Sequence, residues 1–145
     1  MKKKIIALCL VFCLLIFVGF FGLQYLTGHS RVLESNWGIS LPYKAVCRQV
    51  YEKDSGASFH GDGIRYHVFS YKYEDYIDLM FAWPPNHKTD TAAAESRLNA
   101  IEVETEERPD YAACSSWGKS REDGSEILFF WNPEINRLYV IEAFF

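Results

Sequence analysis

The sequence predicts an α+β fold in which an N-terminal transmembrane helix precedes a small exported domain. An uncharged, mostly apolar run occupies residues 5–26. The rest of the chain contains two groups of β-forming segments with helical periodicity between them. Two strands, then helices, then three strands favour an antiparallel sheet of about five strands, with one or two helices packed on one face.

The N-terminal run is long enough to cross a membrane. Residues 5–26 follow three lysines and would form a helix of about 33 Å, against a hydrocarbon core of about 30 Å. A cleaved signal usually has an apolar stretch of only about 7–15 residues, so we interpret the run as an uncleaved signal anchor. Cleavage after residue 30, which would release a secreted protein, is the alternative. Lipid attachment at Cys9 or Cys13 is disfavoured because bulky residues precede both.

Charge predicts the orientation of the chain. The lysines place residues 1–4 in the cytoplasm as a basic segment. Residues 27–37 are predicted to be a polar tether, and residues 38–145 to be the exported domain. The part after the anchor carries 12 Lys and Arg and 19 Asp and Glu, a net charge of −7. We therefore expect a cell-membrane protein with an extracytoplasmic domain and no nucleic-acid partner, because nucleic acids bind basic surfaces.

Five segments are predicted to be strands. Residues 43–53 and 64–73 are rich in aromatic and β-branched residues, and turn-forming residues separate them. The last three strands are expected at residues 111–118, 126–131 and 137–144. Asp123-Gly124 and Pro133 supply the turn signals between these three strands.

Two helices are predicted between these groups. A short one near residues 74–81 is indicated by a single apolar face formed by Tyr73, Tyr76, Ile77, Met80 and Phe81. A paired strand is the alternative for this segment. A second would start at a cap on Asp90 or Thr91 and continue to about residue 107. Its buried side would carry Ala94, Leu98 and Ile101.

Two cysteines, Cys47 and Cys114, lie outside the anchor. In an oxidising compartment such a pair can form a disulfide, which is one interpretation of these two residues. Two buried free thiols in strands are the alternative, and the spacing alone does not decide between them.

The segment His60-Gly61-Asp62-Gly63 is a candidate site. Glycines and an aspartate between two strands are explained by a turn. In the functional interpretation, His60 acts as a base or metal ligand that Asp62 orients. A zinc site would need further ligands such as His67 and His87, whose spacing matches no metal signature.

Two further observations concern residues within strands. Glu142 alternates with apolar residues near the C-terminus, so its carboxylate is expected to be exposed or paired with Arg65 or His67 on a neighbouring strand. A series of aromatic residues from Tyr66 to Trp83 is either core or a recognition face. Tyr71, Tyr73 and Trp83 are the candidate binding residues of that face, beside His60 and Asp62.

These observations favour a non-enzymatic binding module in the bacterial cell envelope. Its partner would be a protein, a peptide or an envelope component, and no cofactor or catalytic residue is predicted. The alternative is a hydrolase or a metal-binding protein that uses His60 and Asp62. No G-x-S-x-G nucleophile motif is present to favour the hydrolase.

Overall fold

The computed structural model describes residues 16, 29–42, 47–56, 62–83 and 88–145. The chain divides into two compact units, Met1–Tyr43 and Lys44–Phe145. The predicted transmembrane segment lies outside the described residues, apart from Ile16. Within the described part of the chain, no helix is both long enough and apolar enough to span a membrane.

In the first unit, residues predicted to be a tether form helix α2, His29–Trp37. The segment is polar on average, but Leu33 and Trp37 are four residues apart and therefore lie on one side of the helix. The helix ends where Gly38 adopts φ +68°, and its amide donates to Glu34 O at 2.9 Å. Glycine accepts this left-handed conformation without steric cost, which makes it a common helix terminator.

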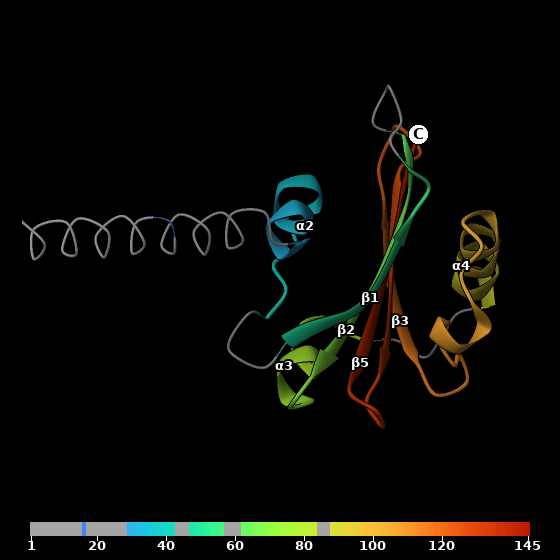
Figure 1. The fold of residues 1–145 in the computed structure, drawn as a ribbon. Coiled ribbons are helices and arrows are strands. Elements are labelled where there is room, and N and C mark those ends of the chain that lie inside the picture. The colour runs from blue at the N-terminus through green and yellow to red at the C-terminus, as the bar shows by residue number, and fades with distance from the viewer. Residues whose placement is uncertain (1–15, 17–28, 43–46, 57–61, 84–87) are drawn as a thin grey trace, which may run out of the picture. The chain divides into compact units, whose positions relative to one another are not determined.

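The second unit is built on a five-stranded antiparallel sheet (Figure 1), as predicted. Its order is β1-β2-β5-β4-β3, so the final strand lies at the centre of the sheet. The strands β3, β4 and β5 form a meander, and β2 pairs with β5 from Gly63 to Ser70. The bounds are β1 Cys47–Asp54, β2 Gly63–Tyr71, β3 Ser115–Ser120, β4 Glu126–Asn132 and β5 Arg137–Phe144.

Helix α4, Lys88–Ala100, covers one face of this sheet. Ala94, Leu98 and Ile101 are buried, as the periodicity predicted. They pack in a core with residues from the sheet and its connections: Tyr66, Val68, Val103, Cys114, Leu128, Phe130, Tyr139 and Ile141.

The second helix begins and ends earlier than predicted. Asp90 and Thr91 lie inside α4 rather than capping it, and residues 105–107 form a separate 3-10 turn, η1 (Thr105–Glu107). The chain leaves the helix at Glu102, whose φ is +53°. Arg108 holds the segment after the helix in place, because its guanidinium donates hydrogen bonds to Val103 O at 2.7 Å and to Glu95 Oε2 at 2.8 Å.

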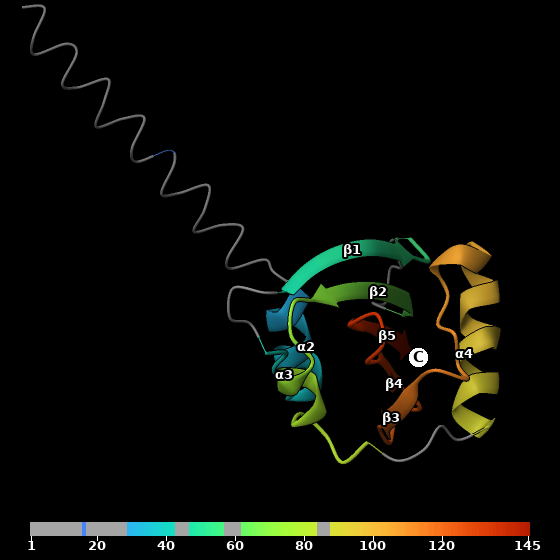
Figure 2. The ribbon, with the colours of Figure 1, turned by 90° about the horizontal axis from the view of Figure 1, so that it is seen from below.

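The other face of the sheet carries α3, Asp75–Asp78, at the end of β2. Trp131 Nε1 donates to Asp78 Oδ1 at 2.8 Å, and Ile77 is fully buried. Figure 2 shows the sheet between α3 and α4. The expectation of one or two helices on one face therefore holds for α4, whereas α3 lies on the other face. Aromatic and aliphatic side chains point from both faces of the sheet, so each face needs its own cover.

The two cysteines are free thiols and cannot be bridged. Cys47 begins β1 at one edge of the sheet, and Cys114 precedes β3 at the opposite edge. Four strand spacings of about 4.8 Å separate these edges, whereas a disulfide needs Cα atoms within about 7 Å. Burial raises the pKa of both thiols, that of Cys114 to about 12.

Candidate functional site

The predicted site at His60 and Asp62 falls in the connection between β1 and β2. His60 and His87 lie outside the described residues. Asp62 is exposed. Near it, the hairpin is closed by Ser55, whose amide donates to Ile64 O at 2.9 Å and whose hydroxyl accepts from Ile64 N at 3.0 Å. The described part of this connection therefore has the hydrogen bonds of a turn, as the structural interpretation expects.

The predicted aromatic face divides into buried and exposed residues. Tyr71 is buried, with its ring edge-on to Trp131 at a centroid distance of 6.2 Å, and burial raises its pKa. Trp83 is half-buried, and its Nε1 donates to Ile77 O at 2.8 Å. The prediction of a recognition role is wrong for Tyr71, which belongs to the core. Of the three aromatic candidates, only Tyr73 is exposed, at 49 %.

Tyr73 is one of three exposed apolar residues near one end of the sheet. We call this the end surface, formed by Tyr73 after β2, Leu79 after α3 and Ile135 in the turn between β4 and β5. Leu79 is 87 % exposed and Ile135 is 52 % exposed. Tyr71 N donates to Asn136 O at 2.9 Å, which holds the β4–β5 turn against the end of β2. Figure 1 shows this turn and α3 at the same end of the sheet.

The backbone presents these three side chains outward. Asn136 has φ +51°, a conformation that asparagine tolerates better than most residues, and it ends the turn that carries Ile135. The burial of Ile77 and the hydrogen bond from Trp131 to Asp78 fix the rotation of α3 about its own axis. Leu79, four residues after Asp75, therefore lies next to it on the outer side of the helix.

Acidic residues adjoin the end surface. Tyr73 lines an open depression of about 300 Å³ together with Lys72, Glu74, Asp75 and Asn136. Lys72 Nζ lies 5.2 Å from the centre of the Tyr73 ring. Glu74 and Asp75 are exposed, so two carboxylates and one lysine line this depression, and the exposed Glu134 precedes Ile135 in the turn. This arrangement suits a ligand that brings both an apolar group and positive charge.

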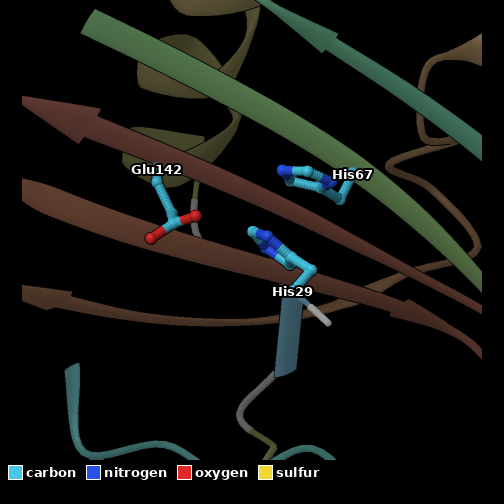
Figure 3. Close-up of side chains that lie close together, drawn as sticks. All are labelled: His29, His67 and Glu142. Atoms are coloured by element: carbon cyan, nitrogen blue, oxygen red, sulfur yellow. The ribbon is translucent and has the colours of Figure 1, made fainter. Parts of the chain in front are cut away.

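A second candidate is a polar group on the sheet face opposite α4. Glu142 on β5 is fully buried, and Arg65 of β2 lies directly across from it in the strand register. One carboxylate oxygen of Glu142 and one imidazole nitrogen of His67 lie within 4.8 Å of each other. Figure 3 shows both side chains projecting from neighbouring strands on the same side of the sheet. Glu142 is therefore not solvent-exposed, and Arg65 and His67 lie on the neighbouring strand, where the paired alternative expects them.

The environment of His67 keeps its ring neutral. Burial lowers its pKa to about 4, although Glu52 raises it in part. Glu52 lies directly across from His67 on β1, with its Oε2 3.9 Å from His67 Nδ1. His67 also lines a depression of about 280 Å³ with Glu52, Lys53 and Asp54. An imidazole of such low pKa is a weak base near neutral pH, but it remains a good metal ligand.

Sequence reasoning missed two residues of the end surface. Leu79 was overlooked because it lies off the apolar face of the predicted helix, although an apolar residue on the charged side is itself a signal of exposure. Ile135 was interpreted only as part of the turn between two predicted strands.

Comparisons with protein families, curated proteins and solved structures find no match for this chain.

Proposed function

We propose that the chain is a single-pass membrane protein whose exported domain is a non-enzymatic binding module. The domain binds a protein segment that carries an apolar side chain next to Lys or Arg. The observation that carries this proposal is the end surface, where Tyr73, Leu79 and Ile135 are exposed among carboxylates.

The anchor part of the proposal rests on the sequence. Residues 5–26 have the length and apolar composition of a membrane span, and the lysines before them favour a cytoplasmic N-terminus. The net charge of −7 after the anchor agrees with an acidic binding surface that attracts basic partners and is repelled by anionic lipid.

The described geometry favours binding over catalysis. A general base works best with a pKa near the working pH, whereas that of His67 is about 4. The end surface combines exposed apolar side chains with charges at its rim, which is the usual anatomy of a protein-binding surface. Exposed apolar groups on a rigid support bind with little loss of conformational entropy.

Selection of displayed peptides against the purified chain tests this function. We expect the selected peptides to share an apolar residue flanked by Lys or Arg. The Leu79→Ser variant should weaken their binding by about 10-fold or more, because a buried leucine side chain contributes about 1.5–3 kcal/mol. Titration of a labelled peptide in detergent solution measures this change.

The Phe145→Ser variant is the matched control. Phe145 is 65 % exposed and follows β5 at the opposite end of the sheet from the end surface. Its replacement should change peptide binding by less than about 2-fold, the effect expected of a residue outside the interface. Selected peptides without basic residues, or equal losses in the two variants, would refute the proposed surface.

A further inference from the structure

A buried carboxylate and a buried imidazole share the sheet face opposite α4, apart from the end surface. Glu142 is fully buried, and the side chain of His67 is 12 % exposed. Their ligand atoms lie within 4.8 Å of each other (Figure 3), and both side chains come from adjacent strands of a paired ladder. The backbone under the pair is thus held by sheet hydrogen bonds, so both side chains start from fixed positions on neighbouring strands.

We propose that the His67–Glu142 pair binds a zinc ion. Imidazole nitrogen and carboxylate oxygen are both common zinc ligands, with bonds of about 2.0–2.2 Å. Small side-chain rotations would bring the two ligand atoms to a common ion. Water or a ligand group would complete the coordination. This inference does not depend on the proposed peptide-binding function.

The electrostatics of the pair suit a divalent cation. Positive charge beside a buried carboxylate lowers the cost of removing it from water. The guanidinium of Arg65, directly across from Glu142, lies over the Phe144 ring at 4.9 Å from its centre. A metal ion would place two positive charges beside the carboxylate while using His67 in its neutral form, which is the form that coordinates metals.

Glu52 would act as a positioning residue for His67. It lies on the strand next to β2, and its Oε2 is 3.9 Å from His67 Nδ1. Because the Glu52 side chain is 69 % exposed, it can move closer without disturbing the core. Carboxylates that accept the second ring N–H of a metal-bound histidine fix the orientation of the ring and strengthen the metal bond.

Zinc titration of the full chain in detergent, with a chromophoric chelator as competitor, tests this site. We expect one zinc ion per chain. His67→Gln and Glu142→Gln should weaken binding by about 100-fold, and Glu52→Gln by about 10-fold, the effect of losing an orienting carboxylate. Glu95→Gln is the matched control, because Glu95 bonds to Arg108 and Tyr111 beside the α4 core. It should bind zinc as tightly as the wild type.

Two further measurements keep the test decisive. A double variant, His60→Gln with His87→Gln, should retain full affinity, and loss of binding there would assign the zinc to those residues instead. If the variants at the pair do not fold, the wild type still decides. The imidazole NMR signals of His67 must shift or broaden as one equivalent of zinc is added. Unchanged signals, or no saturable binding, would leave the pair as a structural contact and overturn the proposal.

Discussion

His67 couples the stability of the fold to pH. Its pKa in the folded chain is about 4, against about 6.5 when unfolded, and the largest cause is burial. Glu52 and Asp54 on β1 raise this pKa in part, and Arg65 on the same strand lowers it further. The unfolded chain therefore binds a proton before the folded chain does, so stability falls as the pH drops below about 6.5 and the loss is complete below about 4.

The size of this effect is measurable. Between about pH 7.5 and pH 5, the protonation of His67 should lower the free energy of unfolding by about 2 kcal/mol. Urea unfolding in the presence of a chelator measures it. The His67→Gln variant should lack this part of the pH dependence. If the free energy of unfolding falls equally with pH in the wild type and in the variant, groups other than His67 cause the pH dependence.

Alternation along a strand predicted the neighbours of Glu142 but not the burial of Tyr71. Residues two apart share a face, so a carboxylate within an apolar series must meet a partner across the ladder. The same alternation could not say whether the face of Tyr71 is solvent-exposed, because helices lie against both faces of the sheet. The exposure of Leu79 likewise depends on how Ile77 and Asp78 fix the short helix.

At the scale of elements, strands were easier to predict than helices. Each predicted strand exists, with ends within a few residues of the structure, because β-branched and aromatic runs ended at clear turn signals. The helix α2 was missed because only two of its residues form an apolar pair. The end of α4 was placed too late, because the contacts that stop it come from Arg108, beyond the helix.

We expect Arg108 to be important for the stability of α4. Its guanidinium bonds to Val103 O, Glu95 and Asn99, which joins the helix to the segment after it. Arg108→Met keeps the apolar stem but removes these bonds, and should lower the free energy of unfolding by about 2 kcal/mol. Arg48→Met, on the exposed side of the edge strand β1, should change it by less than about 0.5 kcal/mol. Denaturant unfolding of both variants measures the difference, and equal effects would contradict this role.

At the scale of the whole molecule, the order of the strands in the sheet could not be predicted from the sequence. Each strand was visible locally, but the pairing of β2 with β5 joins segments about 70 residues apart and leaves β1 and β3 at opposite edges. That order separates Cys47 from Cys114, which excludes the disulfide that seemed equally plausible from spacing. It also brings the end of β2 beside the β4–β5 turn, and so assembles the end surface from distant segments.

The most direct test of the central claim is site-specific photo-crosslinking of the full chain in its native cells. A photoreactive amino acid at Leu79 or Ile135 should give one discrete adduct with an envelope protein, and the crosslinked peptide should carry an apolar residue beside Lys or Arg. The same amino acid at Phe145 should give none. Adducts of equal yield from all three positions, or crosslinks to lipid alone from the end surface, would contradict the account of this domain as a protein-binding module.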